Sequence, residues 1–305
     1  MAPAEQSGLK VLWATDGSDE SRVALPLLRR LVLPVTEKLT VLSVAPQSFI
    51  SGARPDPMFL TRTTPAARRR ALIEAEDVAQ QAATDLDPPP EIEVGALSRW
   101  GNAIEEVLRV SRTMRSDLVV IGAKGHSQLE LILLGSVSQG VVQHSPKPVL
   151  IARPGPDDLD RVLIGYDGSP HARKAVQFLD SLNLNENVVL HLVYVLEPFA
   201  PPKGATGRFR RQAIEDLKAL NEQQDTMAQK ALGVMLAQLN AHGRKVEADV
   251  LNGPAGPTLD ATAVKAGADL IVLGVRKPST ESHYLLGATA EKLVRNSRSS
   301  VLVVK

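Results

Sequence analysis

Three glycines and a serine stand at fixed intervals near the middle of the chain. Two residues separate Gly122 from Gly125, nine separate Gly125 from Gly135, and Ser136 follows at once. Glycine has no Cβ, so the backbone can approach a phosphate closely at these positions and can adopt positive φ. Free N–H groups at the start of a helix favour an anion, and the hydroxyls of Ser136 and Ser138 add donors. These residues predict a phosphate-binding loop.

The same frame returns in the second half of the chain in an altered form. Gly274 and Gly287 are retained, but Lys277 replaces the second glycine and Ala288 replaces the serine. If the backbone has positive φ at the replaced glycine, a residue with a Cβ costs about 1–2 kcal/mol there. Ala288 also deletes a hydroxyl, for which the adjacent Thr289 could substitute. The second frame is therefore a degenerate version of the first.

The repeated frame belongs to a longer duplication. KVLWATDGS at 10–18 aligns with RVLIGYDGS at 161–169, and DLVVIG at 117–122 aligns with DLIVLG at 269–274. A repeat of this length indicates duplicated domains rather than a solenoid. The segment ARPGPDDLD is rich in Pro, Gly and Asp, as a boundary should be. We expect one domain at 1–153 and a second at 154–305.

Each copy alternates short apolar strands with helices. Continuous apolar strands suit a parallel sheet that is buried on both faces, and the alternation predicts a doubly wound α/β fold. In the first copy we expect strands at 11–14, 39–44, 92–97, 117–122 and 149–152, with helices at 18–33, 66–86, 103–115 and 136–144. In the second copy we expect strands near 161–165, 188–196, 246–251, 269–274 and 300–304, with helices near 170–181, 208–241, 255–266 and 287–296.

The predicted elements bring the polar and glycine positions of the first copy together. In open α/β sheets, ligands bind outside the carboxyl ends of the strands, near the switch in strand order. Asp16 ends the first strand, Gly122 ends the fourth, and Gly135 opens a helix, so all three can face one crevice. Asp16 would repel phosphate, but it could accept a hydrogen bond from an adenine amine or a ribose hydroxyl.

Composition excludes several classes of function. Lys and Arg total 35 against 34 Asp and Glu, a net charge of +1, which argues against a nucleic acid or other polyanion as partner. The chain has no cysteine, so disulfides and thiolate metal sites are excluded, and a reducing cytosol fits. No apolar run approaches the roughly 18 residues that span a bilayer, so we expect no membrane association and a cytoplasmic location.

Histidines and hydroxyls give little support to catalysis or to a metal centre. The six histidines show no metal-binding spacing with a carboxylate partner, so we expect no metal site built from protein ligands alone. His126 follows Gly125 and could lie near a phosphate. The hydroxyls of Ser136 and Ser138 have no adjacent base in the sequence, so nucleophilic catalysis is unsupported.

Four segments of the first copy resemble one known family. TDGS at 15–18, DLVVIGAKG at 117–125, GSVSQGVV at 135–142 and PKPVLIAR at 146–153 are similar to tandem universal stress proteins, and the resemblance extends over 9–305. It implies a five-stranded parallel sheet in each domain with strand order 3-2-1-4-5, a Rossmann-like fold of the adenine nucleotide alpha hydrolase type. It also implies that two domains pair through their last strands, here Val149–Ala152 and Val301–Val304, with a homodimer as a further possibility.

The resemblance assigns a ligand and its residues. In that family, G-x2-G-x9-G-[ST] marks members that bind ATP, and Mg²⁺ is expected to accompany the phosphates, held partly by water. Adenine would lie near Asp16 and the backbone of Val44, with phosphates on the glycine loop and on 136–138. The implied ATP-binding residues are Ala14, Thr15, Asp16, Val44, Gly122, Gly125, His126, Gly135, Ser136, Val137 and Ser138. The possible degenerate second site comprises Asp167, Val195, Gly274, Lys277, Gly287, Ala288 and Thr289.

Alternatives stay open for the second site and for the function. The second site could be empty or weak, which we favour, or Lys277 could act as a cationic phosphate ligand, or another small ligand could bind. We expect an ATP-binding protein of stress response or signalling that acts through conformation or through an unidentified protein partner. The alternatives are a nucleotide-free scaffold, a slow ATPase and a binder of another adenine nucleotide such as cyclic AMP. Related enzymes need SGGxDS, HxGH or KMSKS elements, whereas the first strands here end in TDGS and YDGS.

Overall fold

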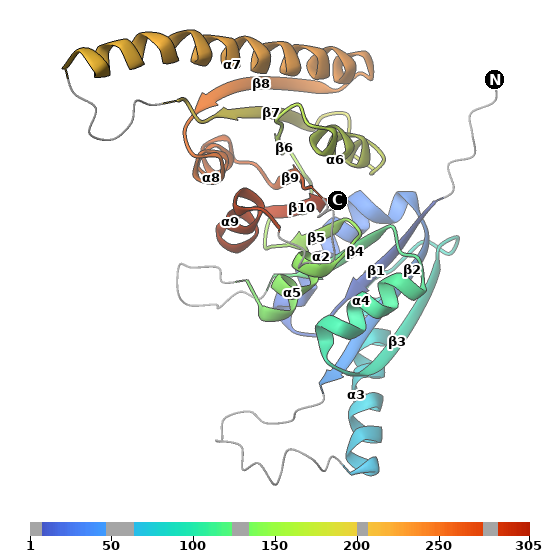
Figure 1. Ribbon diagram of the computed structural model, residues 1–305. Coiled ribbons are helices and arrows are strands. Elements are labelled where there is room, and N and C mark those ends of the chain that lie inside the picture. The colour runs from blue at the N-terminus through green and yellow to red at the C-terminus, as the bar shows by residue number, and fades with distance from the viewer. Residues whose placement is uncertain (1–7, 47–63, 124–133, 200–206, 277–285) are drawn as a thin grey trace. The chain divides into compact units, whose positions relative to one another are not determined.

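The chain divides into two compact units, each of which is described by itself. The computed structural model describes residues 8–46, 64–123, 134–199, 207–276 and 286–305. Within these ranges, unit 1 contains residues 8–158 and 181–183, and unit 2 contains residues 159–180, 184–276 and 286–305 (Figure 1).

Unit 1 is an α/β unit with five parallel strands. Its strands lie in the order β3-β2-β1-β4-β5. Helices connect successive strands, as parallel pairing requires. The elements are β1 (Leu9–Ala14), α1 (Asp19–Arg22), α2 (Ala24–Leu27), η1 (Leu28–Val32), η2 (Leu33–Val35), β2 (Thr36–Pro46), α3 (Pro65–Leu86), β3 (Glu93–Gly101), α4 (Ala103–Thr113), β4 (Leu118–Gly122), α5 (Ser136–His144) and β5 (Val149–Ala152).

Unit 2 repeats this organisation, with its strands in the order β8-β7-β6-β9-β10. The predicted α/β class is confirmed, and the strand order within each unit is the one that the family resemblance implied. The elements are β6 (Arg161–Gly165), α6 (Pro170–Asp180), β7 (Val189–Leu196), α7 (Gly207–Ala241), β8 (Lys245–Asn252), α8 (Ala255–Ala266), β9 (Leu270–Gly274), α9 (Ala288–Asn296) and β10 (Ser300–Val304).

The central strands are buried because their side chains are apolar on both faces. In unit 1, Val11 pairs with Leu118 and Trp13 with Val120, and all four side chains are at most 3% exposed. Unit 2 has the same arrangement, with Val162 paired to Leu270. Burial of this kind is what continuous apolar runs predict for a parallel sheet covered by helices on both sides.

The helix that follows β1 is less regular than the sequence predicts. One helix was expected over 18–33, but the chain forms two short α-helical turns, the π-helical η1 and the 3-10 turn η2. Pro26 and Pro34 lack the N–H that a continuous helix needs, so the hydrogen-bond pattern must change around them. The corresponding segment of unit 2 is the uninterrupted α6, whose proline is its first residue.

Other boundaries differ from the expectations by a few residues. Strand β2 extends at both ends beyond 39–44, and β3 continues to Gly101. The segment between the predicted strand 39–44 and the predicted helix 66–86 falls largely outside the described residues, because only 45, 46, 64 and 65 of it belong to them. Within the described part of the chain, no helix is both long and apolar enough to span a membrane.

Candidate functional site

A cavity in unit 1 lies at the carboxyl ends of the central strands. It brings together parts of β1, α1, β2, α4, β4 and the start of α5, which are far apart in the sequence. The lining residues are Ala14, Thr15, Asp16, Ser18, Glu20, Ser21, Leu42, Val44, Ala103, Val107, Ile121, Gly122, Gly135, Ser136, Val137 and Ser138.

Nine of the eleven residues predicted for this site line the cavity. The other two, Gly125 and His126, lie outside the described residues. Sequence reasoning missed the contribution of α4, which adds Ala103 and Val107. These two residues stand four positions apart, the spacing that places side chains on one face of a helix. That spacing could have identified the face of α4, but it does not say which strand end the helix crosses.

The cavity lining has an apolar part and a polar part. Small and branched side chains from β1, β2, α4 and β4 form the apolar part, namely Ala14, Leu42, Val44, Val107 and Ile121. Such a wall suits a flat, weakly polar ring, and ligand pockets usually combine an apolar lining with a few polar groups. The polar groups here are the turn after β1 and the first residues of α5.

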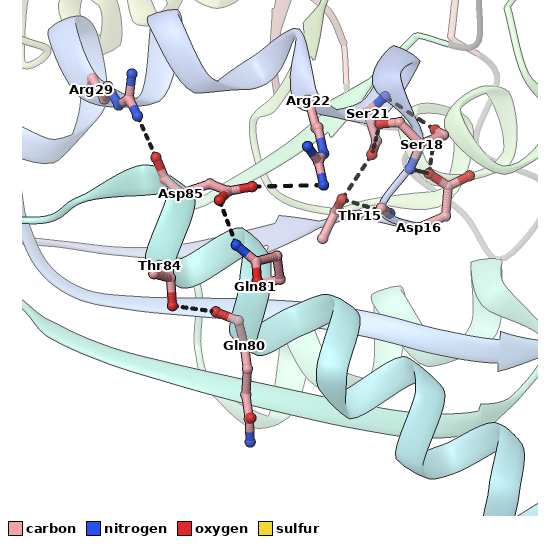
Figure 2. Close-up of polar contacts among 11 residues, drawn as sticks. Thr15, Asp16, Ser18, Ser21, Arg22, Arg29, Gln80, Gln81, Thr84 and Asp85 are labelled. Carbon is pink, nitrogen blue, oxygen red and sulfur yellow. Dashed lines mark hydrogen bonds and ion pairs between the residues drawn. The ribbon is translucent and has the colours of Figure 1, made fainter.

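The turn after β1 holds Asp16 in a fixed conformation. Ser18 donates two hydrogen bonds to Asp16 Oδ1, from its backbone N at 3.0 Å and from Oγ at 2.5 Å (Figure 2). Gly17 supports the turn with φ of 78°, a conformation that glycine adopts without steric cost. Both bonds from Ser18 use Oδ1, so the carboxylate is held as an acceptor at the cavity wall.

Hydrogen bonds also control the charge of Asp16. Burial is the largest single influence and would raise the pKa of this carboxyl group. The bonds from Ser18, with a smaller contribution from Ser21, act in the opposite direction and bring the pKa below the ordinary value. Hydrogen bonds to a carboxylate stabilise its charged form. Asp16 is therefore an anion at neutral pH, and it can accept but not donate hydrogen bonds.

A chain of hydroxyl groups joins the turn to α1. Ser21 Oγ donates to Ser18 O at 2.8 Å and lies 2.8 Å from Thr15 Oγ1. Because the Ser21 hydrogen is used on Ser18 O, Thr15 is the donor in the second contact. Thr15 Oγ1 in turn accepts from Gly17 N at 3.2 Å. These hydrogen bonds connect the end of β1 to the start of α1.

Arginine side chains fix α1 and η1 to the end of α3. Arg29 Nε donates to Leu86 O at 3.1 Å. Arg29 also donates to Asp85 O, and Arg22 forms an ion pair with Asp85 at 3.7 Å (Figure 2). The carbonyl groups at the C-terminus of a helix lack intrahelical partners, and cationic side chains satisfy them. The irregular segment after β1 is therefore held against the end of α3.

Gly122 is required by packing, independently of any ligand. A Cβ at this position would lie 2.5 Å from Glu20 O and 2.7 Å from Ser21 Cα, both of which are backbone atoms of α1. The φ angle of Gly122 is not positive, so its backbone conformation does not require glycine. Glycine is necessary because a side chain would not fit. Its carbonyl accepts a hydrogen bond from Ser138 Oγ at 2.8 Å, which attaches the start of α5 to the end of β4.

The N-terminus of α5 offers free backbone donors to the cavity. Helices α1, α3 and α4 are capped by side chains, those of Ser18, Thr64 and Asn102. The N-cap of α5 is Gly135, with φ of −64° and no side-chain cap among the described residues. The first N–H groups of a helix have no intrahelical acceptor, so they are available to an anion. Ser136 is exposed at this end, whereas the hydroxyl hydrogen of Ser138 is used on Gly122 O.

The corresponding turn of unit 2 is similar but less fully bonded. Ser169 N donates to Asp167 Oδ1 at 2.9 Å, and Gly168 has φ of 72°. The Ser169 hydroxyl accepts a bond from Ala172 N at 3.1 Å. Tyr194 lies near this turn, and its pKa is raised by burial and by the charge of Asp167.

Larger side chains occupy the place that corresponds to the apolar wall. Gly165 aligns with Ala14, and a Cβ there would lie 2.6 Å from Leu273 Cδ2 and 3.1 Å from Leu259 Cδ1. Leu259 aligns with Val107 of unit 1, so one extra carbon reaches toward the end of β6. A methyl group at this place in unit 2 would therefore require the ends of Leu273 and Leu259 to move.

The start of α9 also differs from the start of α5. Gly287, the N-cap of α9, has φ of 81° and ψ of 141°, a combination that is essentially restricted to glycine. Ala288 is exposed, Thr289 is half-buried, and Val195 lies in β7. Lys277 lies outside the described residues.

Gly274 of unit 2 repeats the packing of Gly122. A Cβ on Gly274 would lie 2.1 Å from His171 O and 2.6 Å from Ala172 N, which are backbone atoms of α6. The end of β9 therefore approaches α6 in unit 2 as closely as the end of β4 approaches α1 in unit 1.

Among the residues that the structure describes, no group of three or more His, Asp or Glu side chains could hold a metal ion.

Comparison with known proteins places the chain in a family. The pattern of the Universal stress protein family matches twice, over residues 9–153 and 159–305. The chain therefore belongs to this family and carries its domain twice in tandem.

Individual relatives are distant. Universal stress protein Slr1230 of Synechocystis is 25% identical over 190 residues, which are 62% of this chain and 58% of that protein. Universal stress protein G of Shigella flexneri is 30% identical over 132 residues, which are 43% of this chain and 87% of that protein. The matched part of this chain thus spans little more than half the length of the Synechocystis relative.

Solved structures share the fold over the whole chain. A universal stress protein from Archaeoglobus fulgidus has a TM-score of 0.65 at 24% identity and covers 97% of this chain and 98% of its own. A functionally unknown protein from Pseudomonas aeruginosa has a TM-score of 0.62 at 18% identity and covers 98% of this chain and 93% of its own. At these identities, the likeness establishes the α/β fold.

Proposed function

We propose that unit 1 binds an adenine nucleotide, ATP, in its cavity, and that the chain acts in stress response through nucleotide-dependent conformation or partner choice. The observation that carries this proposal is the convergence of an apolar wall, the Asp16 carboxylate and the uncapped N-terminus of α5 on one cavity. These are the three environments that a base, a ribose and a phosphate chain require.

The residues present fit the parts of the nucleotide. The apolar wall, which includes Ala14 and Val44, suits the adenine ring. Asp16 is an acceptor for a ribose hydroxyl or the adenine amine, because its lowered pKa keeps it charged. The N–H groups from Ser136 onward and the Ser136 hydroxyl suit the phosphates. A bound nucleotide with its Mg²⁺ would supply negative charge at this helix end, and the protein would position it.

Binding without rapid turnover is the better-supported form of this proposal. The hydroxyl hydrogen of Ser138 is bonded to a carbonyl oxygen rather than to a base. A hydroxyl nucleophile needs an adjacent group that removes its proton. In the experiment below, slow hydrolysis would appear as ADP among the released nucleotides. A preference for cyclic AMP over ATP would appear in the competition measurement.

We further propose that unit 2 does not bind nucleotide. Leu259 and Leu273 lie close to Gly165. The backbone conformation of Gly287 at the start of α9 also differs from that of Gly135 at the start of α5. The tandem repeat also fits an internal pair of like domains, at 1–153 and 154–305, in which the second copy supplies a partner surface to the first.

The test compares Ser136→Asp with the matched Ala288→Asp. An acidic residue in the first turn stabilises a helix, so neither change should harm folding, but it places negative charge where phosphate would bind. The measurements are the nucleotide released from purified protein on denaturation and the affinity for Mg-ATP by calorimetry, with cyclic AMP and adenosine as competitors. We expect one nucleotide per chain, at least a tenfold loss of ATP affinity in Ser136→Asp, and no change in Ala288→Asp.

The outcomes separate the parts of the proposal. Equal ATP affinity in Ser136→Asp and the unmodified chain would contradict the phosphate site at α5. Loss of affinity in Ala288→Asp would contradict an empty unit 2. Tighter binding of cyclic AMP than of ATP would change the ligand and leave the site in place, and no binding of either would favour the scaffold function.

A further inference from the structure

Helix α7 is much longer than the strand that it covers. It contains 35 residues, or about 52 Å at the rise of an α-helix, whereas β8 contains eight residues, or about 26 Å. Figure 1 shows α7 running alongside β8, with the N-terminal part of the helix continuing past the C-terminal end of that strand. About half of the helix therefore extends beyond the sheet of its own unit.

Burial along α7 shows where its support begins. The first buried residue among those described is Ala228, twenty-one positions after Gly207, and it is followed by Leu232, Met235 and Leu239. In α3, the corresponding helix of unit 1, the first buried residue is Ala71, six positions after the helix start. The additional length of α7 therefore makes no fully buried contact within the described chain.

A second apolar stripe runs along α7 beside the buried one. Its positions alternate in steps of four and three, which is the heptad spacing of helices that pack against other helices. Three of its large side chains are among the most exposed hydrophobic ones of the chain, with Leu220 at 46%, Met227 at 59% and Val234 at 55%. We call this stripe the α7 ridge, and it comprises Ala213, Leu217, Leu220, Gln224, Met227, Ala231 and Val234.

We propose that a second copy of this chain packs antiparallel on the α7 ridge. The ridge contains two kinds of core position, the a and d positions of the heptad. In an antiparallel pair of helices, each a residue faces a d residue of the partner helix. Leu217 then faces the partner's Met227, and Leu220 faces the partner's Gln224, around a twofold axis near residue 222. The overhanging half of each helix lies beside the sheet-supported half of the other, so both are covered and the contact closes on itself.

Charge selects this register and orientation. Asp216 and Lys230 are both exposed and flank the same edge of the ridge. In the register above, Asp216 lies beside the partner's Lys230, and the symmetry makes this pair twice. A shift of one heptad would set Asp216 beside the partner's Gln223 or the partner's Ala237. A parallel pair would set it beside the partner's Asn221, so only the antiparallel register matches opposite charges.

The first test removes the ridge. Analytical ultracentrifugation of the full chain should show a dimer for the unmodified protein and a monomer for Met227→Glu, with at least a hundredfold loss of dimer affinity. The matched control is Gln229→Glu, which adds the same charge to an exposed position of α7 away from the ridge. A monomeric unmodified protein, or a dimer that Met227→Glu leaves intact, would overturn the proposal.

The second test reverses the charge pair. Asp216→Lys and Lys230→Asp should each weaken the dimer about five- to tenfold, because each would place like charges side by side twice. The double variant restores opposite charges and should recover most of the affinity. Weakening that simply accumulates in the double variant would contradict the register.

The third test distinguishes antiparallel from parallel packing. The chain contains no cysteine, so a single introduced thiol can react only with its copy in the partner. Gln223→Cys lies near the twofold axis and should form a disulfide-linked dimer under mild oxidation, whereas Val234→Cys should remain monomeric on a denaturing gel. The reverse result would show a parallel pair and overturn the proposed arrangement.

Discussion

Unit 1 and unit 2 keep the same turn after their first strand but surround it differently. Both turns place a glycine at positive φ and a serine that donates its backbone N–H to the preceding aspartate. Unit 1 leaves a cavity beside this turn, whereas unit 2 has Leu259 and Leu273 close to the end of β6. The same turn therefore occurs in both units, and the units differ in the side chains and the space beside it.

The helix pairs near these turns show a reciprocal exchange of size. In unit 1, a Cβ on Gly140 of α5 would lie 2.3 Å from Ile104 Cδ1 of α4. In unit 2 the glycine is Gly256 of α8, and a Cβ there would lie 3.2 Å from Lys292 Cδ of α9. The large and small residues have exchanged helices, so close approach of the two helices is retained while the side chains that fill the space have changed.

The largest effect should come from the glycines that end β4 and β9. Gly122→Val and Gly274→Val would force a side chain into backbone atoms of α1 and α6, respectively, with a loss of about 3 kcal/mol in the free energy of unfolding. Urea denaturation of each variant checks this. We expect similar losses in both units, because the contact is the same whether or not a ligand binds. A Gly122→Val protein of normal stability that had lost only its nucleotide would contradict this account.

A smaller effect should come from the apolar wall of unit 2. Gly165→Ala should cost about 2 kcal/mol, because the added methyl group meets Leu273 and Leu259. Leu259→Val introduces the smaller residue that unit 1 has at this place, so the double variant should be more stable than the sum of the single losses predicts. The measurement is a double-mutant cycle by urea denaturation. Strict additivity would show that these residues do not compete for the same space.

The starts of α5 and α9 provide a test of backbone conformation. Gly287→Ala should destabilise the protein by about 1 kcal/mol, because φ of 81° with ψ of 141° is unfavourable for a residue with a Cβ. Gly135→Ala has no such backbone cost, since Gly135 has φ of −64°. Thermal unfolding of the two variants under the same conditions checks the difference. Equal losses would show that the positive φ of Gly287 carries no strain for alanine.

The sequence predicted the fold and most of the cavity because the relevant signals are local. Apolar runs marked the central strands, the Asp-Gly-Ser repeats marked the turns, and the helix predicted over 208–241 is found as Gly207–Ala241. The irregular segment after β1 was less predictable, because Pro26 indicates a disturbance but does not specify a π-helical turn. The packing role of Gly122 could not be predicted from the sequence, because the atoms next to it are backbone atoms of α1, which is distant in the chain.

Two other features depend on the ends of elements rather than on their type. The overhang of α7 depends on where β8 ends beneath it, and a helical pattern in the sequence does not show how much of the helix a sheet covers. The crowding near Gly165 depends on which residue of α8 crosses the end of β6. A signal for Gly122 was nevertheless present, because the altered second frame keeps Gly274 although it lost the glycine and the serine expected for phosphate.

The smallest predicted effect concerns the serine hydroxyl of the unit 1 turn. Ser18 Oγ donates to Asp16, whereas the Ser169 hydroxyl of unit 2 accepts from Ala172 N. The bonds from Ser18 help to bring the pKa of Asp16 below its ordinary value, against the effect of burial. A lowered pKa in the folded state contributes stability that is present above the unfolded-state pKa and is lost as the pH falls through the folded-state pKa. Ser18→Ala should therefore raise the pKa of Asp16, as measured by NMR titration of its carboxyl carbon, and should reduce stability at neutral pH more than at acid pH. The matched Ser169→Ala should leave the pKa of Asp16 unchanged. An Asp16 titration that Ser18→Ala does not move would show that the hydroxyl bond contributes nothing to the charge of the site.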